Sequence, residues 1–242
     1  MKRVIVKLKK GEPLVVKGKA KVRVSGRRRI AKTALVPYAR EVFSRLVRAH
    51  PDAHCELDYR TPLELLEATI LSAQCTDKRV NMVTPLLFRT FPTAQSLADS
   101  PPEKVEEIIK STGFFRNKTK SLIGLGKALV ERHDGEVPDS MAALVKLPGV
   151  GRKTANVVLG NAFGKNEGIV VDTHVARVSF RLGLTRETDP VKIEQDLMQL
   201  FPREDWALLS HLLIFHGRRI CEARRPKCEI CPLNDICPSS MV

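Results

Sequence analysis

At residues 147–158 the chain reads LPGVGRKTANVV, a stretch that predicts two helices joined by a tight glycine hairpin. The apolar spacing just before it, at 141–147, and within its second half, at 152–159, is helical. Its glycines let the backbone turn sharply and come close to a phosphate, and the amides that open the second helix carry partial positive charge. The hairpin at residues 141–160 is therefore predicted to hold a DNA backbone without reading its sequence.

Two other interpretations of this stretch are weaker. A nucleotide-binding P-loop requires Gly directly before the Lys and a strand leading into the loop. Here Arg152 precedes Lys153, and the lead-in is helical. The second alternative, a helix end followed by a new helix that binds nothing, leaves the combined run from Leu147 to Thr154 unexplained.

Two residues in and after the hairpin are candidates for chemistry. Lys153 lies in the first turn of the second helix, where the helix dipole and neighbouring Arg152 disfavour its charged form and favour a neutral nucleophile. A lysine that only contacts phosphate is the alternative. Asp172 precedes a periodic run from Val175 to Leu184, so on position alone it is an N-cap.

Four of the six cysteines lie within the last 22 residues, with the spacing C-x6-C-x2-C-x5-C. In a reducing compartment such clustering favours metal ligation over disulfides. The candidate ligands are Cys221, Cys228, Cys231 and Cys237. Zinc and a [4Fe-4S] cluster both accept four cysteines, and cysteine identity does not choose between them.

The charge of the chain is strongly positive and unevenly distributed. Its 242 residues carry a formal +14, which makes a polyanion such as nucleic acid the expected partner. Residues 1–36 hold 13 Lys or Arg and one acid, Glu12, so this arm carries +12 of the total. DNA contacts on the remaining chain must therefore come from local placement of basic residues.

The arm at residues 1–35 has few large apolar residues, and we expect it to be disordered. A short hairpin turning at Gly11-Glu12-Pro13 is the alternative, supported by alternation in places. The chain shows no apolar run long enough to span a bilayer and no signal peptide, so we expect a cytoplasmic protein without membrane contact.

From Val36 onward apolar residues recur at spacings of three and four, with cap signals such as Thr61-Pro62-Leu63-Glu64 and Thr188-Asp189-Pro190. About ten short helices follow, with no alternation of strands and helices. The sequence predicts an all-α fold.

Together, the hairpin run, the run VDTH at 171–174 and the cysteine spacing resemble the endonuclease III family of helix-hairpin-helix glycosylases. The runs LSAQ at 71–74 and GEVP at 135–138 match as well, so the likeness extends from about Val36 to Pro238.

This resemblance implies two helical domains with the DNA cleft between them. One is a six-helix bundle at 61–168 that contains the hairpin. The other combines an N-terminal helix at 36–60 with 169–242 and its iron-sulfur loop at 221–237.

The resemblance also assigns roles to residues. Lys153 matches the family's Schiff-base nucleophile, Asp172 its essential carboxylate, and the four cysteines its [4Fe-4S] ligands. Gln74 aligns with the residue that fills the gap left by a flipped base, and Phe114 stands where a Leu usually wedges into the duplex. The remaining expected DNA contacts are Pro148, Gly149, Val150, Gly151, Arg152 and His174.

The implied function is a bifunctional DNA glycosylase and AP lyase of base excision repair. It would remove oxidised or ring-saturated pyrimidines from double-stranded damaged DNA and cleave the abasic site by β-elimination. We expect a monomer, associated with the nucleoid if the source is prokaryotic. The alternatives are a mismatch-specific monofunctional glycosylase of the same fold and a non-catalytic DNA-binding protein.

Overall fold

The computed structural model describes residues 4–7, 13–16 and 30–242, and the chain divides into two compact units. The first comprises Met1–His54 together with Gly168–Val242, and the second comprises Cys55–Glu167. The divisions fall after His54 and Glu167, whereas the sequence analysis placed them after residues 60 and 168.

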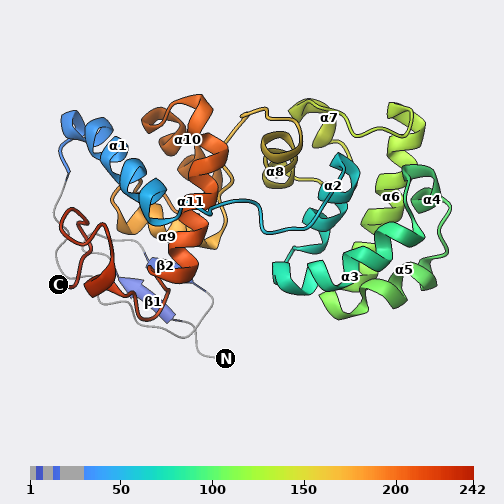
Figure 1. Ribbon diagram of the computed structural model, residues 1–242, viewed down its shortest axis with the longest axis horizontal. Helices are drawn as coiled ribbons and strands as arrows, with labels where there is room; N and C mark the ends of the chain where they lie inside the picture. Colours follow the sequence, from blue (N-terminus) through green and yellow to red (C-terminus); the bar gives the residue numbers. More distant parts are fainter. Residues whose placement is uncertain (1–3, 8–12, 17–29) are drawn as a thin grey trace. The chain divides into compact units, whose positions relative to one another are not determined.

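The second unit is a bundle of helices. Helix α6 (Phe115–His133) is flanked by α4 (Ala94–Ala98) and α5 (Pro102–Ile109), which pack against it (Figure 1). The other elements are α2 (Pro62–Leu71), α3 (Asp77–Thr90), the 3-10 helix η1 (Lys110–Thr112), α7 (Met141–Leu144) and α8 (Arg152–Ala162). Helix α8 packs against α2, which brings the predicted hairpin onto the bundle.

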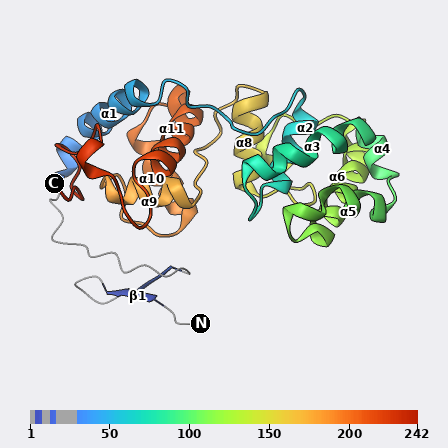
Figure 2. The same ribbon diagram turned by 60° about the horizontal axis from the view of Figure 1, so that its bottom comes forward.

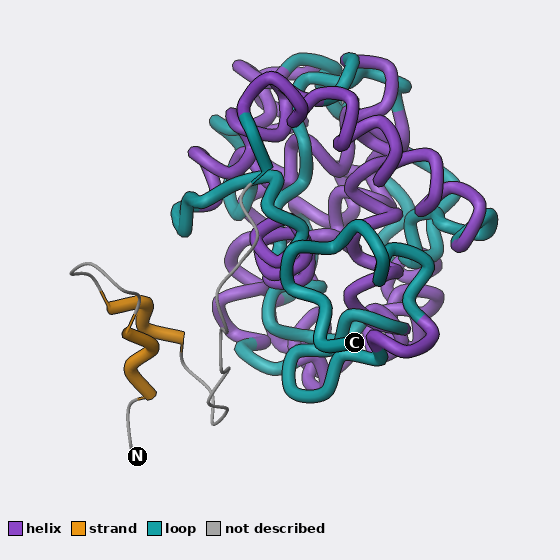
Figure 3. The backbone as a smooth tube through the Cα atoms, turned by 90° about the vertical axis from the view of Figure 1, so that its left-hand side faces the viewer, coloured by secondary structure: helices purple, strands orange, loops and turns teal. Residues whose placement is uncertain are grey.

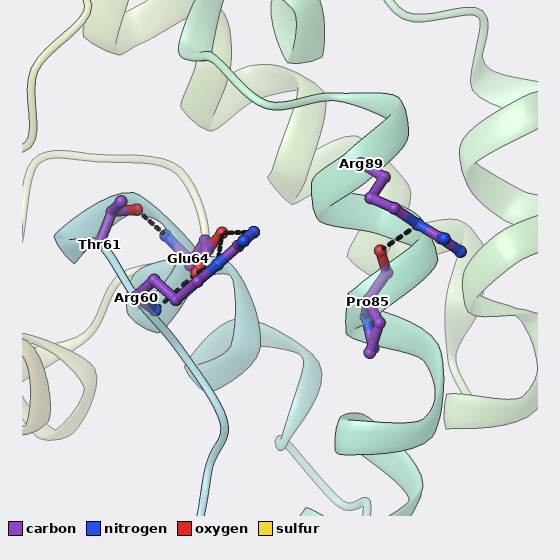
Figure 4. A network of polar contacts seen from close by, with 5 residues as sticks. All are labelled: Arg60, Thr61, Glu64, Pro85 and Arg89. Carbon is purple, nitrogen blue, oxygen red and sulfur yellow. Dashed lines mark hydrogen bonds and ion pairs between the residues drawn. The ribbon is translucent and has the colours of Figure 1, made fainter.

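Helix α2 begins where the sequence predicted, at Thr61. The Thr61 hydroxyl accepts a hydrogen bond from the Glu64 amide at 3.2 Å, and Pro62 occupies the first helical position. The Glu64 carboxylate in turn accepts from the Arg60 amide at 2.6 Å and binds the Arg60 guanidinium at 2.8 Å (Figure 4). These local contacts stabilise the start of the helix that leads to Gln74.

Helices α4 and α6 approach so closely that Gly126 has no room for a side chain. A Cβ atom there would lie 2.6 Å from the Ala98 nitrogen and 2.7 Å from the Ala94 oxygen. Both neighbours are backbone atoms, which cannot rotate away, so this glycine is required by packing rather than by its dihedral angles.

Glu67 is a carboxylic acid inside the apolar core of the second unit, on α2. Its side chain is 1% exposed, and its Oε2 atom has no hydrogen-bond partner among the described residues. Burial, with a smaller contribution from the Glu64 charge, raises the pKa of Glu67 well above its ordinary value. The folded protein therefore holds this group in its protonated form beyond the pH at which an unfolded chain would release the proton.

Replacement of Glu67 by Gln is expected to raise Tm at pH 7.5 and to have little effect near pH 5. Above its unfolded pKa the free acid ionises only in the unfolded chain, so stability falls as pH rises toward the raised folded pKa. Each pH unit in this window costs about 1.4 kcal/mol, or roughly 3–5 °C of Tm. Thermal melts across this pH range test the prediction, with Glu131→Gln, an exposed change on α6, as the control. Parallel pH profiles for wild type and Glu67→Gln would contradict it.

The first unit is built on α11 (Trp206–Arg219), which packs against α9 (Thr173–Arg181) and α1 (Lys32–Ala49). Helix α10 (Pro190–Leu200) contacts α1, and the 3-10 helix η2 (Arg203–Asp205) leads into α11. Beyond α11 the chain runs as a loop to the C-terminus (Figure 3), interrupted by the 3-10 helix η3 (Cys228–Ile230).

Helix α1 differs from the segment expected at 36–60. It begins at Lys32 and continues through Pro37, and it ends at Ala49. The end follows from Pro51, because a residue that precedes proline disfavours helical dihedrals. Residues 50–60 form turns and irregular backbone instead.

Two short strands lie in the basic arm, where disorder was expected. Strand β1 (Val4–Lys7) pairs antiparallel with β2 (Pro13–Val16) (Figure 2). In this pairing Val4 lies opposite Val16. The paired strands fit the hairpin alternative, with Pro13 as the first residue of a strand, and the disorder expected for the rest of the arm stays a prediction. The alternating stretch at 17–24 lies outside the described residues. The all-α prediction is confirmed for residues 30–242, and the arm is its exception. Over the described residues, no helix combines the length and apolar character needed to cross a bilayer.

Candidate functional site

The hairpin between α7 and α8 is a tight turn that only glycine permits. The Val150 amide donates to the Leu147 oxygen at 3.1 Å, and Gly149 adopts a φ of 77°. A Cβ atom on Gly149 would lie 2.8 Å from the Ser121 Cβ on α6. Both the left-handed backbone and the close packing therefore exclude a side chain.

The turn leaves the start of α8 open to a ligand. Its N-cap is Gly151, so no side chain caps the helix, and Gly151, Arg152 and Lys153 are exposed. Pro148 is half-buried, and Val150 is only 6% exposed, so Val150 can face a ligand through its backbone alone. An uncapped helix start with exposed cations fits a phosphate group.

Lys153 is the second residue of α8 and projects from an exposed position. Within the part of the chain that the structure describes, its Nζ has no hydrogen-bond or ion-pair partner. A lysine that stabilised the fold by an ion pair would be held by an acid. Lys153 is instead accessible to a ligand at the hairpin.

Asp172 is the N-cap of α9, as its position in the sequence predicted. Its Oδ1 atom accepts from the amides of His174 and Val175, each at 2.8 Å. Its Oδ2 atom has no partner among the described residues, and the side chain is half-buried. One oxygen is thus fixed by the helix, which orients the carboxylate, and the other is available for chemistry.

Gln74 and Phe114 lie in two exposed loops of the second unit and share an unusual backbone. Gln74 has a φ of 54° and Phe114 a φ of 49°, and neither is glycine. Left-handed conformations of this kind cost about 1–3 kcal/mol and cluster at functional sites. Phe114 is 62% exposed, although a large apolar side chain gains nothing from water. Both residues are therefore presented to the outside at a cost in stability.

His174 lies at the edge of the first unit's core. Its Nδ1 atom is 3.1 Å from Arg177 Nη2, and its side chain packs on Gly217 of α11, where an added Cβ would lie 3.0 Å from the His174 Cβ. The ring is half-buried. The role of His174 in DNA binding stays a prediction.

The four clustered cysteines gather in the loop that follows α11. All four are half-buried and unbridged: Cys221, Cys228, Cys231 and Cys237. The pKa of the Cys231 thiol is raised to about 11, first by burial and then by the proximity of the other three sulfurs. A metal centre binds the thiolate form of cysteine, so its binding would replace the protons of these thiols.

No three His, Cys, Asp or Glu side chains of the described residues are arranged as ligands of a single ion. A [4Fe-4S] cluster does not require such an arrangement, because each cysteine would bind a different iron. The donor set therefore fits a four-iron cluster.

Arginines that the sequence analysis did not identify hold this loop in place. Arg181 donates to the oxygens of Glu222 and Ala223 at 2.7 and 2.9 Å, and its Nη1 lies 3.3 Å from the Cys221 sulfur. Arg177 donates to the Cys221 oxygen at 3.2 Å. On α1, Arg45 donates to the Asp235 carboxylate at 2.6 Å.

His216 on α11 also escaped sequence reasoning. Its Nε2 is 3.6 Å from the Cys231 sulfur, and its Nδ1 is 3.1 Å from Nε2 of His50. Arg177 and Arg181 stand at positions i and i+4 of α9, but their targets lie about 40 residues away in sequence, and the Asp235 target of Arg45 lies 190 positions away. Such contacts leave no local pattern.

Two family models match the chain. A model of the HhH-GPD superfamily of base excision DNA repair proteins matches residues 68–203, and a model of the iron-sulfur binding domain of endonuclease III matches residues 221–237.

Curated relatives named endonuclease III match most of the chain. The protein from Synechocystis is 55% identical over 202 residues, covering 84% of this chain and 92% of its own length. The Escherichia coli protein is 41% identical over 197 residues, covering 81% and 93%.

Solved structures agree with these relatives. An endonuclease III trapped as a covalent intermediate with DNA superposes with a TM-score of 0.80 at 45% identity, covering 84% of this chain and 95% of that one. A thermostable thymine-DNA glycosylase, at 24% identity and a TM-score of 0.76, shares the fold.

Proposed function

The chain belongs to the endonuclease III family of base excision repair DNA glycosylase/AP lyases, and we propose that Lys153 and Asp172 perform its reaction on oxidised or ring-saturated pyrimidines. The observation that carries the proposal is the placement of Lys153. It is an exposed lysine without an ion-pair partner among the described residues, directly after a hairpin that fits a DNA backbone.

In the proposed glycosylase step, the lone pair of neutral Lys153 Nζ attacks the sugar C1′ of the damaged nucleotide. The bond from C1′ to the base breaks, and the base leaves with the two electrons of that bond and takes up a proton. A damaged base is extruded from the duplex first, because C1′ cannot be reached inside the stack.

In the proposed lyase step, the bond from C1′ to the ring oxygen breaks, the oxygen takes up a proton that Nζ loses, and Nζ and C1′ form a protonated imine. The imine makes the hydrogen on C2′ more acidic. Removal of this hydrogen as a proton expels the 3′ phosphate by β-elimination. One lysine thus serves both steps.

Asp172 carries the counter-charge in this scheme. Its Oδ1 is held by two amides, so the carboxylate stays in one orientation. The open Oδ2 stabilises the positive charge that develops on the sugar and passes protons between the steps. A preoriented charge is effective because it needs no reorganisation during the reaction.

The DNA partner is proposed to be damaged double-stranded DNA, bound by a monomer in the cytoplasm. The open start of α8 contacts phosphates, with Pro148, Gly149, Val150, Gly151 and Arg152 as the contact residues. Phe114 wedges into the duplex, and Gln74 fills the space left by the extruded base. Their exposure and left-handed backbones support these roles.

Members of this family carry a [4Fe-4S] cluster, and in this chain Cys221, Cys228, Cys231 and Cys237 would bind it. The cluster would cross-link four positions of the loop after α11, and Arg177 and Arg181 hold the start of this loop by hydrogen bonds to its backbone.

The purified protein is expected to be yellow-brown, with about four iron atoms and matching sulfide per chain. Replacement of Cys228 by Ser should remove the colour and most of the iron and lower solubility, since the loop loses its support. Iron, sulfide and zinc analysis checks both statements, with Cys55→Ser as the control because Cys55 packs in the other unit. Stoichiometric zinc without sulfide would contradict the cluster assignment.

A panel of duplexes, each with one oxidised pyrimidine, one mismatch or one abasic site, tests the proposed function. We expect excision of oxidised pyrimidines and nicking of the abasic duplex. Excision only at mismatches without nicking would favour a monofunctional glycosylase, and binding without excision would favour a non-catalytic protein.

A further inference from the structure

A buried lysine, Lys118, joins two loops of the second unit. It lies on α6 and is 5% exposed. Its Nζ donates to the Leu71 oxygen at 2.7 Å and to the Thr112 oxygen at 2.9 Å. Among the described residues, neither oxygen has another donor, and Lys118 has no acidic partner.

The two carbonyls stand directly before the two strained loops. Leu71 is the last residue of α2, and Gln74 follows three positions later with its φ of 54°. Thr112 ends η1, and Phe114 follows two positions later with its φ of 49°. A single ammonium group therefore connects the points from which both loops depart.

Burial of the Lys118 ammonium costs free energy, so its presence on α6 needs a specific reason. Burial lowers the pKa of Lys118, because the ammonium loses its hydration, and the nearby Cys75 side chain only partly opposes this shift. An apolar side chain would avoid that cost but would leave the Leu71 and Thr112 oxygens without a donor. The ammonium offers something that packing does not, namely two hydrogen bonds that fix both loop origins relative to each other and to α6.

Strained backbone persists only where its surroundings over-determine it. The turn at Gln74 is closed by the Cys75 amide, which donates to the Ser72 oxygen at 3.0 Å. The turn at Phe114 is closed by the Asn117 and Lys118 amides, which both donate to the Phe114 oxygen at 3.1 Å. Each loop is thus fixed within itself, and Lys118 supplies the connection between the two.

We propose that Lys118 is a positioning residue that sets the spacing of Gln74 and Phe114, so that both side chains enter the DNA duplex together when a base is extruded. The inference rests on the proposed roles of these two residues. Lys118 does not touch DNA and takes no part in the chemistry at Lys153.

The test compares Lys118→Met with the wild-type holoenzyme on two substrates under single-turnover conditions. One is a duplex with a single oxidised pyrimidine opposite a purine. The other is a duplex with an abasic site in a bulge, which has no opposite base to separate and no gap to fill. Lys118→Met should lose about 10- to 100-fold on the paired lesion and retain nicking and borohydride trapping on the bulge. Lys127→Met, which removes an exposed lysine of the same helix, should match wild type on both.

A double-mutant cycle measures the energetic coupling of Lys118 to Gln74 and to Phe114, which general destabilisation of the protein would not produce. Gln74→Ala and Phe114→Ala are each made in the wild-type and Lys118→Met backgrounds. If Lys118 acts through these residues, each alanine change should cost less in the Lys118→Met background, because the spacing is already lost. Lys118→Arg keeps donors at this position and should recover part of the lost rate if it folds.

Three outcomes would overturn the inference: equal losses on both substrates, no loss on either, or additive effects in the cycle. If Lys118→Met does not fold, the cycle is run with Lys118→Arg, where additive effects again overturn it. A wild-type protein inactive on both substrates would instead contradict the proposed function, so the two failures are distinguishable.

Discussion

Replacement of Lys153 by Gln is expected to abolish strand nicking and the borohydride-trapped adduct with DNA, while binding to a damaged duplex is largely retained. The amide of Gln has no lone pair that can attack C1′, so neither the displacement nor the imine can form. Affinity should survive because the hairpin backbone and the start of α8 remain intact. Gel-resolved trapping and nicking assays, paired with a binding titration at fixed salt, measure the two properties separately.

Lys146→Gln is the matched control for charge. Lys146 is an exposed lysine that follows α7 and precedes the turn at Pro148–Gly151, and its replacement removes the same positive charge without touching the proposed nucleophile. We expect Lys146→Gln to form the adduct and nick DNA. A Lys153→Gln protein that still formed the trapped adduct would remove Lys153 from the mechanism, and the phosphate-contact interpretation would then hold.

The features that the sequence predicted correctly are those encoded by neighbouring residues. The cap at Thr61 and the N-cap at Asp172 each depend on a side chain and an amide two or three residues away. The hairpin depends on Gly149, whose dihedral angle no other residue adopts at so little cost. Local rules are sufficient for such features.

The features that the sequence missed depend on contacts between distant segments. Lys118 reaches Leu71, 47 positions away, and Arg181 reaches Ala223, 42 positions away. In sequence these residues resemble ordinary basic side chains on helix surfaces. Glu67 was missed for the same reason, because burial from neighbouring helices, not its own pattern, determines its protonation. Such roles become visible only when packing brings the partners together.

The end of α1 shows the opposite case, in which the sequence contained a local signal that the prediction did not use. Pro51 follows His50 and disfavours helix at that residue, so the helix could have been ended there from sequence. In the arm, the strands at Val4–Lys7 and Pro13–Val16 contain β-branched residues, a local pattern that favours the hairpin alternative.

Replacement of Asp172 by Asn separates the charge of this side chain from its role as a helix cap. Asn is as good an N-cap as Asp, because its side-chain oxygen can accept from the His174 and Val175 amides. Tm should therefore change little. The single-turnover rate should fall by about 10²- to 10³-fold, since the developing positive charge on the sugar loses its counter-charge.

Asp189 offers a matched control for this prediction, because it caps α10 in the same way. Its Oδ1 accepts from the Val191 and Lys192 amides at 3.0 and 3.2 Å, and its side chain is exposed. Asp189→Asn makes the same chemical change at another helix start of the same unit, so any general effect of the substitution on helix capping appears in both variants. A selective loss of rate in Asp172→Asn assigns the effect to the charge at Asp172. Equal rates in the two variants would reduce Asp172 to a structural cap and would require another group to stabilise the cationic sugar.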